Sequence, residues 1–221
     1  MLSVVPTSWW TEKQRLAFHK AMEEYELSQL ATSEQAVAHH NLGIMHSNRR
    51  RFEAAEKAYR LASKIDPQFV PARFNLAMLY NQQENKAAAM RVLQEVTELA
   101  PDMADAHYSL GLLLAEDERR MKDSAQALAR AAKLSPKQGR VHYNHGLALQ
   151  RLGKPNEAET ALLTAHNLEP TARDYVYALA VLCSQEKRWP DALRWTDQLS
   201  RLDPSNLEWR ELRQLIIRSA K

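Results

Sequence analysis

The chain has 221 residues, of which 45% are hydrophobic and 26% charged, and its formal net charge is +3. These values are typical of a soluble chain that is long enough to bury a continuous core. The sequence has no apolar run of 18 residues, which excludes a transmembrane helix. Residues 1–10 lack the basic start and apolar centre of a secretory signal. We therefore expect a cytoplasmic location, or a periplasmic one if the sequence is a fragment.

The N-terminal segment, residues 1–35, is predicted to contain one helix of an incomplete copy of the repeat that fills residues 36–204. Within residues 13–30, Tyr25 and its neighbours at helical spacing stand where the second helix of a repeat places its packing residues. Trp9 and Trp10 precede this helix, and two indole rings are costly to leave in water. We therefore expect this end to bury its apolar edge, most simply against a second copy of the chain in a homodimer.

Five prolines recur along the rest of the chain at spacings of 34, 35, 34 and 34 residues. They are Pro67, Pro101, Pro136, Pro170 and Pro204. Proline lacks an N–H and disfavours helical geometry in the preceding residue, so the chain must turn at each of them. The period divides residues 36–204 into five units, which we place at 36–69, 70–103, 104–138, 139–172 and 173–206.

Each unit carries small residues at fixed positions in two predicted helices. The first helices contain Gly43, Ala77, Gly111, Gly146 and Ala180, and the second contain Ala55, Ala89, Ser124, Ala158 and Ala192. A residue without a bulky side chain lets two helices approach closely, which explains glycine inside a helix despite its propensity cost of about 1 kcal/mol. The columns therefore predict paired helices in contact.

A final helix is predicted after the last proline, within residues 205–221. Leu207, Leu212, Leu215 and Ile216 are expected to form one apolar stripe, with charged residues around it. An apolar stripe with a polar back is typical of a helix that caps an array of repeats.

With these columns in register, the chain resembles a tetratricopeptide repeat protein. The blocks that carry the resemblance include Ala106–Gly111 and Asn156–Glu159. The resemblance implies an all-α fold: an α-α superhelix, or solenoid, of helix-turn-helix units with a terminal capping helix. His145 and Thr196 depart from the family pattern, which affects local packing. The family also implies a scaffold that binds proteins.

By analogy with the family, the first helices line a concave groove. A mostly aromatic column stands four residues before an aliphatic column, so the two share a helical face, and asparagines lie beside the first column. The groove residues are His40, Asn41, Ile44, Phe74, Asn75, Met78, Tyr108, Leu112, Tyr143, Asn144, Leu147, Tyr177 and Val181. Such a surface would bury apolar side chains of a peptide while the amides pair with its main chain. The alternative is that the rings serve only packing between helices.

Other functions are less favoured by the residues. The basic run Arg49–Arg51 is isolated, whereas phosphate recognition needs a contiguous basic stripe, so nucleic-acid binding is a lesser alternative. His142 and His145 lie three apart on one helix with no Cys, Asp or Glu converging on them by spacing, so no metal site is expected and they are interpreted as packing imidazoles. No catalytic motif occurs, and we expect no enzyme activity and no cofactor.

Two narrower resemblances concern subtypes of the family. Members that bind acidic C-termini use a clamp of Lys, Arg and Asn, and here only Asn75 matches it, so this specificity is not expected. The run from Arg15 through the first two units is similar to the repeat tails that follow multihaem cytochromes in some bacterial proteins, although the haem motif is absent. That likeness would make the chain an accessory domain of a bacterial periplasmic redox protein.

Overall fold

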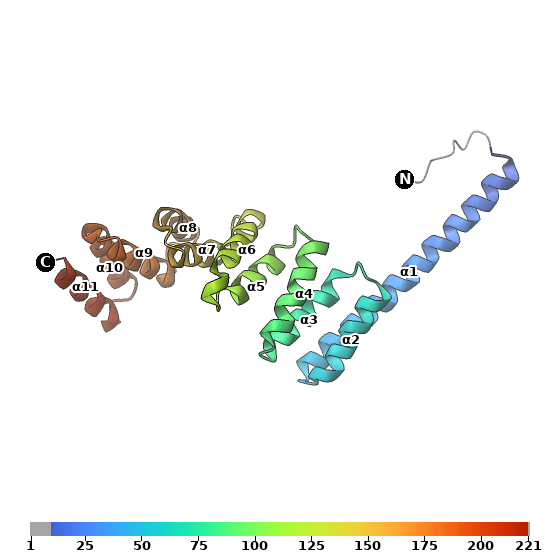
Figure 1. Cartoon of the computed structure of the whole chain (residues 1–221), viewed down its shortest axis with the longest axis horizontal. Coiled ribbons are helices and arrows are strands. Elements are labelled where there is room, and N and C mark those ends of the chain that lie inside the picture. Colours follow the sequence, from blue (N-terminus) through green and yellow to red (C-terminus); the bar gives the residue numbers. More distant parts are fainter. Residues whose placement is uncertain (1–9, 221) are drawn as a thin grey trace. The chain divides into compact units, whose positions relative to one another are not determined.

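The computed structural model describes residues 10–220, and all regular structure within them is helical (Figure 1). The elements are α1 (Glu12–Asn48), α2 (Phe52–Ile65), α3 (Val70–Gln82), α4 (Lys86–Leu99), α5 (Ala104–Leu114), the 3₁₀ helix η2 (Glu118–Arg120), α6 (Met121–Leu134), α7 (Gly139–Arg151), α8 (Pro155–Leu168), α9 (Arg173–Gln185), α10 (Trp189–Leu202) and α11 (Leu207–Ser219). The predicted all-α fold of helix-turn-helix pairs is confirmed. None of these helices is both long enough and apolar enough to cross a membrane.

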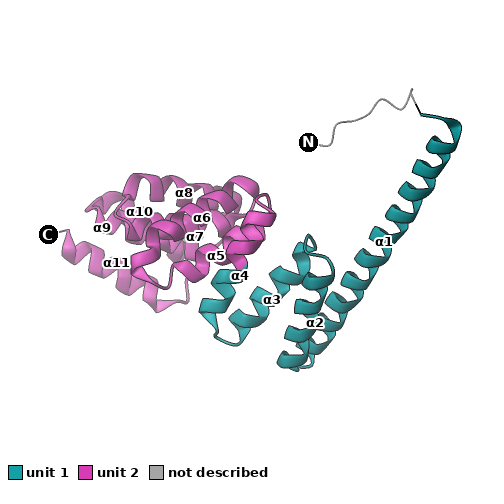
Figure 2. Ribbon diagram, turned by 45° about the vertical axis from the view of Figure 1, so that its right-hand side comes forward, with its two compact units in different colours: residues 1–92 teal, residues 93–221 magenta. Residues whose placement is uncertain are grey.

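The chain forms two compact units, with the boundary between them inside α4 (Figure 2). Unit 1 ends at Val92, and in it α1 packs on α2 and α2 on α3. Unit 2 begins at Leu93, and in it α5 pairs with α6, α7 with α8, and α9 with α10. Contacts of α6 with α7, α8 with α9 and α10 with α11 then join successive pairs. Each unit is thus a stack in which a helix touches its neighbours along the chain.

The prolines end the second helix of each pair as predicted. The helices α2, α4, α6, α8 and α10 all stop two residues before the proline of their repeat. Next to these turns, a basic residue six positions after the proline binds the carbonyl oxygen of that proline in four of the five repeats. The donors are Arg73, His107, His142 and Arg210. These bonds satisfy a carbonyl in the turn and fix the start of the next helix.

The N-terminal helix differs from the expectation. The helix predicted over residues 13–30 does not end there: α1 runs unbroken for 37 residues to Asn48. Residues 31–35 contain neither Pro nor Gly, so nothing in the backbone stops the helix. Thr11 caps it, since its hydroxyl accepts from the Gln14 N–H and its own N–H donates to the Gln14 side chain.

Only the C-terminal part of α1 packs on other helices. Ala36 and Gly43 are buried, whereas every residue from 11 to 31 is exposed. The exposed part extends beyond α2 in both views (Figures 1 and 2). Trp10 packs edge to face on Phe18, with 4.9 Å between ring centroids. Trp9, the second indole of the predicted pair, lies outside the described residues.

The capping helix α11 packs through a different face from the predicted stripe. Ile216 is buried and Leu212 is half-buried, whereas Leu207 and Leu215 are 63% and 60% exposed. The packed face includes Trp209, because residues 209, 212 and 216 repeat at three and four positions and so lie on one side of the helix. The prediction that all four aliphatic residues share one stripe was therefore wrong.

Small residues in the first helices make the close contacts predicted from their columns. A Cβ atom built on Gly146 would lie 2.7 Å from Cγ of Leu162, and one on Gly111 would lie 2.7 Å from Cγ of Leu128. In the second-helix column, the buried Ser124 donates its hydroxyl to the Gly111 carbonyl at 2.7 Å. The first and second helices of a pair therefore touch at the glycine, where no side chain fits.

We expect Gly146→Leu to lower the free energy of unfolding by about 1–3 kcal/mol, because the new side chain would overlap Leu162 on α8. Urea unfolding followed by circular dichroism measures this loss. The matched control is Gly153→Asn: Gly153 has a φ of 70°, a Cβ added there would meet no atom within 4 Å, and Asn tolerates that backbone. Equal midpoints for Gly146→Leu and the wild type would contradict the assigned contact.

Candidate functional site

The predicted groove residues of unit 2 lie on α5, α7 and α9. Tyr108 and Leu112 stand one turn apart on α5, and Tyr143 and Leu147 repeat that spacing on α7. On α9, Tyr177 and Val181 hold the corresponding places. None of these side chains is fully buried, and Leu112 and Tyr177 are 37% and 43% exposed. These six side chains are therefore open to solvent in part, although Tyr177 and Val181 are not among the lining residues of the two clefts that follow.

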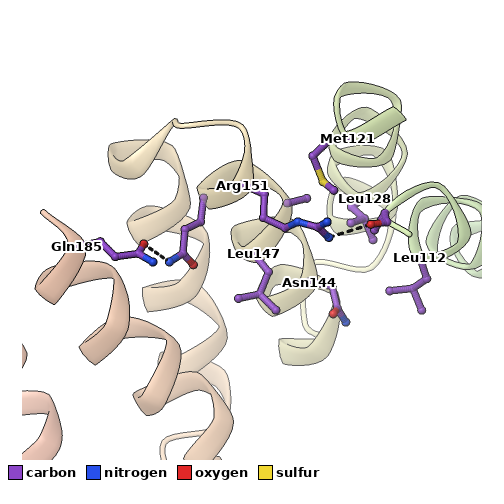
Figure 3. A pocket seen from close by; sticks show the side chains of 10 residues that line it. Leu112, Met121, Leu128, Asn144, Leu147, Arg151 and Gln185 are labelled. Carbon is purple, nitrogen blue, oxygen red and sulfur yellow. Dashed lines mark hydrogen bonds between the residues drawn. The ribbon is translucent and has the colours of Figure 1, made fainter. Parts of the chain in front are cut away.

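An apolar cleft of about 420 Å³ opens between α5 and α7 (Figure 3). Leu112, Met121, Leu128 and Leu147 provide its apolar walls. Figure 3 shows Asn144 between Leu112 and Leu147 at one side of the cleft. The cleft can therefore take an apolar group while a polar amide lies at its edge.

Polar side chains close the other side of this apolar cleft. Arg151 donates to the carbonyl of Ala115 at 2.8 Å and forms an ion pair with Glu118, which ties α7 to the chain that follows α5. Gln150 donates to the side chain of Gln185 at 2.6 Å and so links α7 to α9 (Figure 3). These bonds satisfy the polar groups at this edge of the cleft.

A second, more polar cleft of about 850 Å³ adjoins the first in unit 2. Tyr108, Tyr143, Arg140 and Glu169 are among its lining residues. Leu112 and Asn144 line both clefts. The two clefts are therefore parts of one continuous surface on α5 and α7.

Both N–H donors of the Asn144 side chain bind other groups of the protein. Its amide nitrogen donates to the Tyr108 hydroxyl at 2.9 Å and to the Arg140 carbonyl at 3.0 Å. An asparagine has two N–H donors and one acceptor oxygen, so both donors are engaged. The Tyr108 hydroxyl accepts the first bond and keeps its own proton, because burial raises the pKa of Tyr108 above its ordinary value. The pair therefore offers one acceptor and one donor to a ligand.

A similar pair occurs in unit 1 between α1 and α3. The Asn75 amide nitrogen lies 2.8 Å from Nε2 of His40, and the imidazole also contacts the rings of Tyr59 and Phe69. Burial lowers the pKa of His40, so the neutral ring can accept the amide hydrogen. The structure thus brings together His40 and Asn75, two of the residues predicted for the groove.

The other predicted groove residues of unit 1 differ in their exposure. Asn41 is exposed, and Ile44, Phe74 and Met78 are half-buried. These side chains remain accessible in part.

Sequence reasoning missed several residues of the unit 2 surface. Arg140 lies one turn before Tyr143 and Asn144, which is the signal that could have found it. Tyr175 is buried beside Tyr143, with ring centroids 4.9 Å apart, and supports that ring. Glu169 reaches the start of α7 because Gly139 leaves room: a Cβ there would lie 2.5 Å from the carboxylate oxygen.

Two histidines at equivalent places in their repeats have a structural use. Nε2 of His107 lies 3.1 Å from the Pro101 carbonyl oxygen, and Nε2 of His142 lies 3.0 Å from that of Pro136. These rings fix turns between repeats, which for His142 is a more specific role than the packing predicted for it. Among residues 10–220 no group of three or more His, Cys, Asp or Glu side chains is arranged to hold a metal ion.

Comparisons with solved structures find the same fold in other proteins. YrrB, described as a TPR protein with an unusual peptide-binding site, is 21% identical with a TM-score of 0.73, over 90% of this chain and 98% of its own. PilF of Pseudomonas aeruginosa is 22% identical with a TM-score of 0.66, over 86% of this chain and 89% of PilF. MamA of Desulfovibrio magneticus is 17% identical with a TM-score of 0.67, over 80% of this chain and 96% of the MamA chain. A search of curated protein sequences finds no match.

Family models identify the repeats in the sequence itself. Two models described as tetratricopeptide repeat match residues 49–113 and residues 143–206, which together make up more than half of the chain. The matched stretches include helices of both units and the contact of Gly146 with Leu162. The chain belongs to the tetratricopeptide repeat family.

Proposed function

We propose that the chain is a scaffold that binds a peptide or an extended protein segment on the unit 2 surface of α5, α7 and α9. The observation that carries this proposal is the pair of adjoining clefts that share Leu112 and Asn144. Repeat proteins of this family generally bind protein partners, so the class of ligand follows from the family and its location from the clefts.

The two clefts suit different parts of a peptide. An apolar side chain of the ligand would enter the first cleft and cover Leu112 and Leu147, which removes apolar surface from water. Its main chain would follow the second cleft, where the Asn144 oxygen accepts an N–H and the Tyr108 hydroxyl donates to a carbonyl. One acceptor and one donor are what a peptide unit requires of its partner. The peptide-binding site for which YrrB is described supports this proposal by analogy of fold.

The aromatic rings also hold the fold, so they are poor probes of binding. Tyr108 packs on the buried Leu128 and Ala131 clusters, and Tyr143 packs on the cluster that contains Leu162. Replacing either ring would remove packing within unit 2 as well as groove surface. Leu112 is the better target because it is partly exposed and lines both clefts.

We expect Leu112→Glu to weaken peptide binding by about 10-fold or more, because a carboxylate in the apolar cleft stays hydrated and a buried leucine contact contributes about 1.5–3 kcal/mol. The probe is a peptide selected from a random library against the intact chain, with its affinity measured by fluorescence anisotropy. Leu168→Glu is the matched control, since Leu168 is similarly exposed, at 39%, at the end of α8 outside both clefts. Equal loss in both variants, or none in either, would place the binding surface elsewhere.

We also propose that two copies of the chain associate through the N-terminal part of α1. This part carries large apolar side chains that are left in water, among them Leu16 at 72%, Leu27 at 60% and Leu30 at 56% exposure. A second copy of the chain can cover these side chains, because it is always present in the same solution. Its own α1 presents the same apolar side chains in return. Self-association would use a surface separate from the clefts of unit 2.

The expected result is a molar mass that rises from monomer toward dimer with concentration in sedimentation equilibrium at micromolar protein. Leu27→Gln should shift this equilibrium toward monomer, because it replaces an apolar contact by an amide. Leu61→Gln is the control, since Leu61 on α2 is also exposed, at 41%. A wild-type chain that stays monomeric at every concentration would contradict self-association.

A further inference from the structure

The exposed part of α1 carries a row of four side chains with an internal symmetry. Leu16, Lys20, Glu23 and Leu27 follow one another at intervals of four, three and four residues. This spacing places them on one face of the helix, as in the apolar seam of a coiled coil. All four are exposed. We call them the α1 row.

The spacing of the α1 row is the same when it is read from either end. We propose that two copies pair through it as an antiparallel coiled coil, and this orientation rests on the proposed self-association. The two-fold axis of the pair passes between Ala21 and Met22. Leu16 of one copy then faces Leu27 of the second copy, and Leu27 faces Leu16 in return. Lys20 faces Glu23 of the second copy at both central layers. Each layer formed by the α1 row is therefore apolar against apolar or cation against anion.

The same reversal continues one layer outward. Lys13 and Leu30 extend the spacing at the two ends, by three residues in each direction, and they face each other across the axis. The four methylene groups of a lysine can cover a leucine while its ammonium group stays in water. The pairing thus spans Lys13 to Leu30, which lies within the exposed stretch of residues 11–31.

A parallel pairing in register would bring like charges together. Lys20 would face Lys20 and Glu23 would face Glu23, and like charges at a seam are destabilising. Charged central layers stabilise an antiparallel pair less than leucines would, but they fix its direction and register. Within its own helix, Lys20 lies 3.9 Å from Glu24, and both side chains are more than two-thirds exposed. Such a contact is weak enough to be exchanged for Glu23 of the second copy.

The opposite side of this part of α1 is used differently. Phe18 lies on that side and is covered in part by Trp10, and Met22 and Tyr25 continue its face toward Ala36. The α1 row therefore lies apart from the indole contact and from the face that packs on α2. A second copy can approach the row without displacing either.

Charge reversal tests the central layers in the full chain. We expect Lys20→Glu and Glu23→Lys each to raise the dimer dissociation constant by about 10-fold or more, since each puts like charges in both central layers. The double variant Lys20→Glu, Glu23→Lys restores opposite charges in the antiparallel pair and should return the constant to within about three-fold of the wild type. Lys57→Glu, an exposed charge change on α2, is the control and should leave it unchanged.

Single cysteines test the orientation independently of the charges. Leu16→Cys and Leu27→Cys should form a disulfide when the two variants are mixed and oxidised, and neither should form one alone. In the antiparallel pair two copies of residue 16 are offset by 11 residues, or about 16 Å along the axis, beyond the Cα separation of about 7 Å that a disulfide spans. The native Cys183 is buried, so the wild type gives the background.

The outcomes separate the orientation of the pair from self-association as such. Mixed disulfides together with rescue by the double variant support the antiparallel pair. A dimer in which Leu16→Cys links to itself, or in which the double variant fails to recover, overturns the orientation but leaves self-association standing. A wild-type chain that stays monomeric overturns both.

Discussion

The close approach of two helices at a residue without a side chain is the constraint on which the stacked pairs depend. At Gly146 and Gly111 a single Cβ atom would overlap the leucine of the second helix. Because the helices must touch there, the rotation of each first helix about its axis is fixed. Tyr143 and Leu147, which lie beside Gly146 on α7, then pack on the core with one side and line the clefts with the other. Packing inside a pair thus decides which side chains are available outside it.

Hydrogen bonds between pairs add a second level of order. The bonds from Asn144 to Tyr108 and from Asn75 to His40 each join two successive first helices. Bonds to the proline carbonyls fix the turn between one pair and the next. The asparagine bonds are half-buried and use polar atoms that would otherwise need water at a helix interface. The same polar residues therefore hold successive repeats together and form part of the exposed surface.

The sequence predicted those features that depend on local chemistry. Helix ends two residues before each proline and contacts at the small residues follow from properties of single residues, and both agree with the structure. Features that depend on the surroundings of a residue were harder to predict. The predicted apolar stripe of α11 was wrong because the position of α10 decides which face of α11 is covered. The predicted break before Ala36 was wrong because no residue in that stretch stops a helix. The engagement of the Asn144 amide could not be predicted, since it requires Tyr108 from another helix at 2.9 Å.

The engagement of that amide has a consequence for selectivity. With both of its N–H groups spent, Asn144 can only accept a hydrogen bond. A peptide bound at the proposed surface would therefore have to bring an N–H of its own to this oxygen, and proline is the one residue whose main chain has none. A segment with proline at that point would leave the oxygen without its partner, at a cost of about 1 kcal/mol or more. The proposed surface would then discriminate among peptides by their backbone, independently of their side chains.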